Sequence, residues 1–145
     1  TSVVELTSSS KMTLLMKKLL VILFSLLISF NSNALWWFPI VDSTDGDSYF
    51  IDIDTIKSHN NSVFYWRLKD YLRPNNYGAL SSATYYEGDC SIYKIRVLSF
   101  VFYEKSMGEG DGDQSAPLGD NGDWRYPSPS SVDKVLLDYV CDYVD

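Results

Sequence analysis

The first pattern along the chain is an alternation of hydrophobic and polar residues, which is typical of strands with one buried face. In segment 49–54, Tyr49, Ile51 and Ile53 alternate with Asp52 and Asp54. We therefore predict a strand here, with the side of Tyr49 toward the core and the two aspartates on the other side.

A second alternating segment covers residues 62–71 and follows a pair of asparagines that indicates a turn. In this strand we expect Phe64, Trp66 and Leu68 to face the core, and Arg67 and Lys69 to face solvent.

Two longer strands are predicted over residues 80–89 and 91–104, after a break at residues 73–78 that is rich in proline, asparagine and glycine. The second strand is apolar on both faces over residues 98–103. Such a strand is expected in the middle of a sheet or beneath a helix.

Residues 106–123 have a different composition, with five glycines, five acidic residues and no basic residue. We predict a long mobile loop there, followed by a short strand at residues 124–126.

The last segment has the spacing of a helix. Ser130 and Asp133 form a capping signature after two prolines. An apolar stripe then recurs every three or four residues, at Val132, Val135, Leu136, Tyr139, Val140 and Tyr143. One helix packed on an antiparallel β-sheet is an α+β fold, and we predict that fold class.

The N-terminal part has the pattern of a secretory signal peptide. We interpret residues 1–15 as an upstream extension and residues 16–34 as the signal peptide, because Lys17 and Lys18 precede a 12-residue apolar run and Ala34 completes a small-x-small site. The run is shorter than the roughly 20 residues that span a bilayer. We therefore expect cleavage after Ala34, a single domain over residues 35–145, and no stable membrane insertion. No cysteine lies just after the run, so we expect no lipid anchor.

The two cysteines, Cys90 and Cys141, both lie in this expected domain. An even number of cysteines in a small exported domain favours a disulfide over two free thiols. We predict that a Cys90–Cys141 bridge ties the helix to the sheet.

Charge limits the classes of partner. The full chain carries a formal net charge of −7 at pH 7. A nucleic-acid-binding protein needs a basic face to neutralise phosphates, so we expect no nucleic-acid partner.

An ordered set of residues resembles the surface-adhesin protein E-like family of exported bacterial proteins. The set comprises Trp37, Tyr49-Phe50-Ile51-Asp52, Ile56, Trp66-x-Leu68-x-Asp70-Tyr71, Asp89-Cys90, Lys94, Arg96, Met107-Gly108-x-Gly110, Trp124, Pro129-Ser130 and Cys141. The resemblance implies a small antiparallel sheet with a disulfide-bonded C-terminal helix, and binding of host or surface ligands.

Candidates for chemistry are few. His59, the single histidine, lies in a polar turn with no nucleophile signature around it, so we expect it to be exposed and we expect no enzyme and no cofactor. The turn also contains Asn60-Asn61-Ser62, which matches a glycosylation sequon and is interpreted as a turn alone. The acidic side chains of segment 106–123 could bind calcium weakly, although their spacing fails the EF-hand pattern: Glu109, Asp111, Asp113, Asp120 and Asp123. The alternative is a solvated loop without a ligand.

Aromatic residues supply the candidate ligand surface. Phe50, Tyr65 and Tyr85 are out of phase with the expected core and could form a binding patch on the outer face of the sheet. The patch requires that these three side chains are not buried.

Three functions are consistent with these observations. The first is an exported, non-enzymatic domain that binds a protein or surface ligand, in the periplasm or outside the cell. The second is a periplasmic accessory or envelope-stress protein that binds another envelope protein. The third, ranked last, is a hydrolase that uses Asp52, Asp54 and Asp89.

Overall fold

The computed structural model describes residues 13–23, 36–113 and 122–145. Contacts divide the chain into two units, Thr1–Ala34 and Leu35–Asp145. In the first unit, residues 13–23 are helical and exposed. Among the described residues, no helix is both long and apolar enough to cross a membrane. Two predictions concern positions outside the described residues: cleavage after Ala34, and the possible role of Asp120 in binding calcium.

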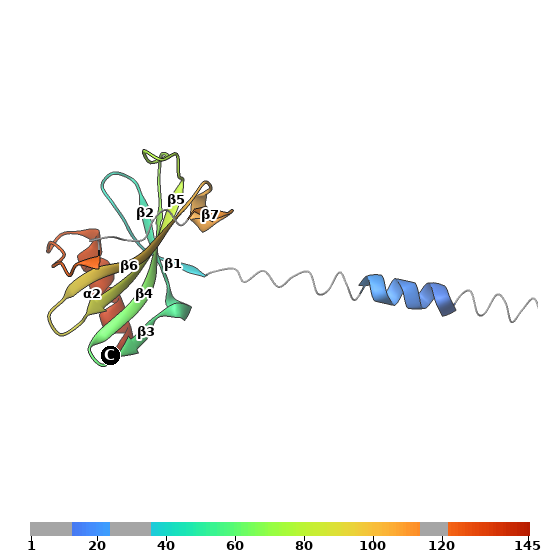
Figure 1. Ribbon diagram of the computed structural model, residues 1–145, viewed down its shortest axis with the longest axis horizontal. Coiled ribbons are helices and arrows are strands. Elements are labelled where there is room, and N and C mark those ends of the chain that lie inside the picture. Colours follow the sequence, from blue (N-terminus) through green and yellow to red (C-terminus); the bar gives the residue numbers. More distant parts are fainter. Residues whose placement is uncertain (1–12, 24–35, 114–121) are drawn as a thin grey trace, which may run out of the picture. The chain divides into compact units, whose positions relative to one another are not determined.

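An antiparallel sheet dominates the second unit (Figure 1). Within the described residues, seven strands form it in the order β1-β2-β4-β5-β6-β7, with β3 paired to β4. Their bounds are Trp37–Asp42 (β1), Ser48–Asp52 (β2), Lys57–His59 (β3), Ser62–Asp70 (β4), Ser81–Asp89 (β5), Lys94–Tyr103 (β6) and Gly112–Asp113 (β7). Short 3₁₀ turns lie at Ile53–Thr55 (η1) and Ser106–Gly108 (η2).

One face of this sheet is covered by the C-terminal helix α2, Val132–Val144, and in Figure 1 strands pass in front of the helix. The buried side chains between helix and sheet are Tyr49, Ile51, Val63, Tyr65, Tyr86, Ile95, Leu136, Leu137, Val140 and Cys141. The predicted α+β fold, an antiparallel sheet with one C-terminal helix packed on it, is therefore confirmed.

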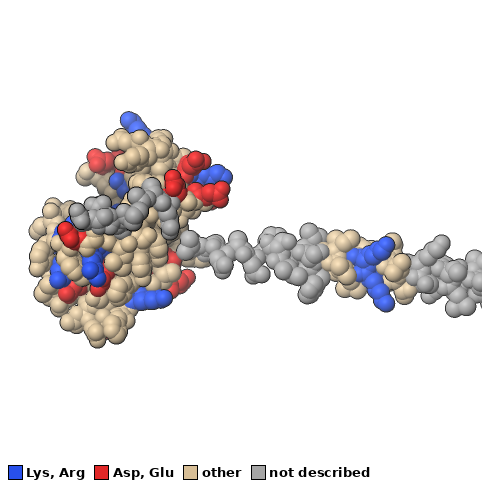
Figure 2. Space-filling model, in the orientation of Figure 1, with Lys and Arg blue, Asp and Glu red and all other residues tan. Residues whose placement is uncertain are grey.

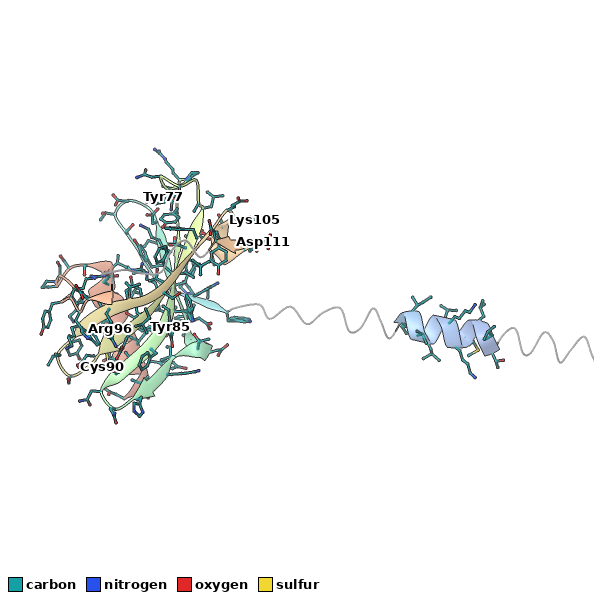
Figure 3. All side chains as sticks on the ribbon, viewed as in Figure 1. Tyr77, Tyr85, Cys90, Arg96, Lys105 and Asp111 are labelled. Carbon is teal, nitrogen blue, oxygen red and sulfur yellow. A yellow bond between two sulfur atoms is a disulfide. The ribbon has the colours of Figure 1, made fainter. Side chains whose placement is uncertain are left out.

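The predicted disulfide is also confirmed. Cys90, directly after β5, is bonded to Cys141 of α2, with their Cα atoms 5.7 Å apart. The bridge joins the helix to the end of a central strand and spans 51 positions of the chain. Figure 3 labels Cys90 at the turn between β5 and β6.

The bounds of β4, β5 and β6 agree closely with those of the predicted strands, whereas shorter elements differ. Residue Ile53 begins η1 instead of continuing β2. The N-cap of α2 is Ser131, whose side chain accepts a hydrogen bond from the Lys134 amide, one residue after the predicted Ser130. The strand predicted at residues 124–126 is reduced to a single bridge between Arg125 and Ile95. Strands β1, β3 and β7 and turn η2 were not predicted, because short edge segments carry too few residues for a period to be visible.

The predicted orientation of β4 relative to the helix is wrong, although Leu68 is buried as expected, against Gly108 of η2 on the side away from the helix. Val63 and Tyr65 face α2, and the side of Phe64 and Trp66 faces away from it. Arg67 lies on the helix side because its guanidinium pairs with Asp133 of α2 at 2.7 Å and lies 4.8 Å above the Tyr86 ring. Pairing with a carboxylate makes the half-buried position of this arginine favourable, which alternation alone does not reveal.

Candidate functional site

Aromatic side chains gather on the sheet face that is turned away from α2. Phe50 of β2, Phe64 and Trp66 of β4, and Tyr85 of β5 lie there, and each is partly exposed. We call these four residues the aromatic face. Alternation along β4 places Phe64 and Trp66 on the side opposite Val63 and Tyr65, so the aromatic face follows directly from the position of the helix.

The rings of the aromatic face contact one another across the strands. Trp66 is directly opposite Tyr85, and their ring centroids are 4.9 Å apart at an interplanar angle of 26°. Phe64 lies on the other side of Tyr85, with centroids 6.5 Å apart. Cross-strand stacking of this kind holds the rings in a fixed arrangement, which lowers the entropy that a binding partner would have to remove.

Charged groups border the aromatic face. Glu87 of β5 accepts hydrogen bonds from Ser62 Oγ at 3.0 Å and from Arg96 Nε at 2.8 Å. Arg96 and Lys94 of β6 lie 4.8 and 4.4 Å from the centre of the Trp124 ring. Figure 3 labels Arg96 and Tyr85 in the same region of the sheet, and Figure 2 shows charged side chains around the margins of an uncharged area. An apolar centre with a polar margin is the usual organisation of a protein-binding surface.

The predicted patch of Phe50, Tyr65 and Tyr85 is wrong for one of its three members. Tyr65 is 1 % exposed and stacks on Tyr86 beneath α2, and its burial raises the pKa of its hydroxyl. Phe50 and Tyr85 are partly exposed on the other face. Phe64 and Trp66, which the pattern assigned to the core, take part in the surface instead. The signal available in the sequence was that residues 63–66 of β4 are apolar on both faces.

The acidic side chains proposed for calcium do not converge. Glu109, Asp111 and Asp113 are exposed near β7, and Figure 3 labels Asp111 beside Lys105 at that end of the sheet. Asp123 lines a hollow near Arg125, and Asp120 is outside the described residues. Among the residues that the structure describes, no group of three His, Cys, Asp or Glu side chains could hold a metal ion.

The carboxylates considered for hydrolysis have separate structural surroundings. Asp52 is 1 % exposed, and burial raises the pKa of its carboxyl group. Asp89 Oδ1 accepts hydrogen bonds from the Ser91 hydroxyl and amide and from the Ile92 amide, which lower its pKa. Asp54 and His59 are exposed. Asp89 thus has a local role in the turn after β5, whereas Asp52 is buried at the end of β2 with its Oδ2 atom unpartnered.

Comparison with known proteins gives one family. The model of the family described as surface-adhesin protein E matches residues 37–142. Two solved structures of Haemophilus influenzae protein E have a similar fold. Crystal form II aligns with a TM-score of 0.57 and 19 % identity, covering 74 % of this chain and 87 % of that one. The other structure aligns with a TM-score of 0.55 and 18 % identity, covering 74 % and 84 %. No curated protein sequence matches the chain.

Proposed function

The chain belongs to the surface-adhesin protein E family, and on this basis we propose that residues 35–145 act as an exported, non-enzymatic adhesin-like domain. In this proposal the domain binds a protein or surface ligand through the aromatic face. In this proposal the signal peptide over residues 16–34 is removed after Ala34.

The observation that carries this proposal is the stacked pair Trp66 and Tyr85 on the helix-free side of the sheet. Tryptophan and tyrosine contribute strongly to binding when they are rigid and lie at the centre of a contact surface. Here both side chains project from central strands, so a partner could contact them without rearrangement of the backbone.

The charged margin supports recognition of a macromolecule. Arg96 and Lys94 place positive charge beside the aromatic rings, and the buried Glu87 pairs with Arg96. Such a margin selects partners by electrostatic complementarity, while the apolar centre supplies most of the affinity. The binding step requires no chemistry on the ligand.

Adherence of bacteria that express the full chain tests this proposal. We expect wild-type cells to bind monolayers of host cells above the level of cells that lack the chain. The double substitution Trp66→Ala with Tyr85→Ala should lower bound cells about tenfold or more, as expected for central aromatic contacts. Tyr143→Ala is the matched control, because Tyr143 is 54 % exposed on α2, which lies on the other side of the sheet.

Equal adherence of the double variant and the wild type would contradict the aromatic face as the binding surface. Protease treatment of intact cells tests the location separately. Digestion of a C-terminal tag without lysis is expected for a surface domain, and protection until the outer membrane is opened would contradict it.

A further inference from the structure

The helix side of the sheet contains a hollow that α2 does not fill. It has a volume of about 520 Å³, and its lining includes Arg67, Thr84 and Phe100. Small-molecule sites in proteins have volumes of roughly 300–1,000 Å³ and combine apolar walls with a few polar groups. The hollow therefore has the size of a small-molecule site, and it lies on the opposite side of the sheet from the aromatic face.

Three types of side chain follow one another across its floor. Arg67 of β4 is directly opposite Thr84 of β5, and Thr84 is directly opposite Phe100 of β6. Neighbouring strands are about 4.8 Å apart, so a cation, a hydroxyl and an aromatic ring lie at successive steps of that length. In the next row Ser82 is opposite Phe102, which extends the hydroxyl and aromatic positions along the strands.

At one end of the hollow, the guanidinium groups of Arg67 and Arg125 share the carboxylate of Asp133. Asp133 accepts a hydrogen bond from Arg67 Nη1 at 2.7 Å and from Arg125 Nη2 at 2.6 Å. Each guanidinium has five N–H donors. Arg67 Nε is buried and has no hydrogen-bond partner among the described residues, and 14 % of the Arg67 side chain is exposed. Arg125 is the more accessible of the two, with 48 % of its side chain exposed, so it can donate to a ligand without leaving Asp133.

Hydroxyl groups and aromatic rings form the rest of the lining. Tyr71 and Ser82 share a hydrogen bond of 3.0 Å between their hydroxyl oxygens. Thr84 lies between Arg67 and Phe100 in the paired strands. Phe100 and Phe102 meet edge to face with centroids 5.4 Å apart, which gives the hollow an apolar wall.

We propose that this hollow binds a carboxylate-bearing monosaccharide of the sialic acid or uronic acid class. The carboxylate accepts hydrogen bonds from Arg125 and Arg67, because guanidinium and carboxylate groups match in geometry and charge. The ring hydroxyls bond to Thr84, Ser82 and Tyr71, and the apolar face of the sugar ring packs on Phe100. A neutral sugar lacks the contact with the arginines, and a simple aliphatic acid lacks the contacts with the hydroxyl groups and Phe100.

Asp123 offers a way to test whether the ligand of the hollow is an anion. It is exposed at the hollow, so its carboxylate repels an anionic ligand. Replacement by asparagine should therefore strengthen binding, whereas a neutral ligand would be indifferent to it.

Binding is tested by NMR titration of the exported product of the full chain with N-acetylneuraminic acid and with glucuronic acid. We expect amide shifts at residues 82–86 and 100–102. Arg125→Gln should weaken binding about tenfold, the loss expected for one charge-assisted contact. Thr84→Val should weaken it without any change of charge, and Asp123→Asn should strengthen it about threefold. Arg73→Gln, an exposed arginine outside the hollow, is the matched control and should bind as the wild type does.

The same titration separates two sources of the ligand. Tighter binding of sialyllactose than of free N-acetylneuraminic acid would identify the ligand as the terminal sugar of a glycan. Tighter binding of the free acid would identify the ligand as the free sugar. Equal binding of the methyl ester of N-acetylneuraminic acid, unchanged affinity in Arg125→Gln, or shifts confined to other strands would overturn the proposal. The Trp66→Ala, Tyr85→Ala variant should bind the sugar normally, so failure of adherence and failure of sugar binding remain distinguishable.

Discussion

Trp66 of β4 and Tyr85 of β5 face each other across the centre of the sheet, with their rings stacked 4.9 Å apart on the side that the helix leaves uncovered. Two large aromatic side chains at this position serve two purposes. They stabilise the pairing of β4 with β5, and they present a rigid apolar surface to a partner.

The contribution of this pair to stability can be measured by a double-mutant cycle. We expect Trp66→Ala and Tyr85→Ala to be coupled by about 1 kcal/mol in the free energy of unfolding, because stacked rings contribute beyond their buried area. Chemical denaturation of the two single variants and the double variant gives the value. Trp66→Ala with Phe102→Ala is the control, since Phe102 lies on the other side of the sheet, and these two effects should add.

The disulfide should dominate the stability of the domain. Closing a loop of about 50 residues is worth roughly 4 kcal/mol in the chain-entropy treatment. We therefore expect replacement of Cys90 and Cys141 by alanine to lower the free energy of unfolding by about that amount, as measured by urea denaturation. Reductant should lower the midpoint of the wild type and leave that of the double variant unchanged. An unchanged wild-type midpoint in reductant would refute this expectation.

Gly88 is required where α2 packs on β5. A Cβ atom at this position would lie 2.6 Å from Leu137 Cδ1 and 3.2 Å from Val63 Cγ1. We expect Gly88→Ala to destabilise the domain by about 1–3 kcal/mol, the usual cost of overpacking a core. Gly122→Ala is the control, because its Cβ would meet only the Val97 carbonyl oxygen, at 3.7 Å. Equal thermal midpoints for the two variants would contradict the close contact of helix and strand.

Asp52 should make stability depend on pH. Burial raises the pKa of its carboxyl group, so the folded state binds this proton more tightly than the unfolded state does. The contribution of Asp52 to the free energy of unfolding is therefore largest at low pH, where the carboxyl group is protonated. It falls as the pH rises from the ordinary aspartate range through the raised pKa. We expect Asp52→Asn to be more stable than the wild type by about 1 kcal/mol at pH 7, because an unpaired carboxylate oxygen is no longer buried.

Thermal unfolding of the two proteins between pH 3 and pH 7 measures this difference. The advantage of Asp52→Asn should shrink as the pH falls. A variant that is less stable than the wild type at pH 7 would show that the ionised carboxyl group stabilises the fold.

Some of these features were already evident in the sequence. The alternation in β4 and β5 and the three-to-four spacing in α2 depend on the chain's own backbone geometry, so their positions are readable from local sequence. The pairing of Cys90 with Cys141 was predictable because the chain has only two cysteines. The candidate site was only half predictable: Phe50 and Tyr85 were identified, and Phe64 and Trp66 were not.

What the sequence determined by itself is the position of the longer elements, β4, β5, β6 and α2, and the covalent link between helix and sheet. What only the tertiary structure decided is which face of the sheet the helix covers, and therefore which aromatic side chains are buried. Residues 63–66 of β4 are apolar on both faces, and the charged Arg67 and Lys69 made the hydrophobic pattern favour the face that the helix does not cover. The choice rests on contacts between residues distant in the chain: Asp133 pairs with Arg67, and Gly88 leaves room for Leu137. These contacts bury Tyr65 beneath the helix and leave Trp66 on the surface.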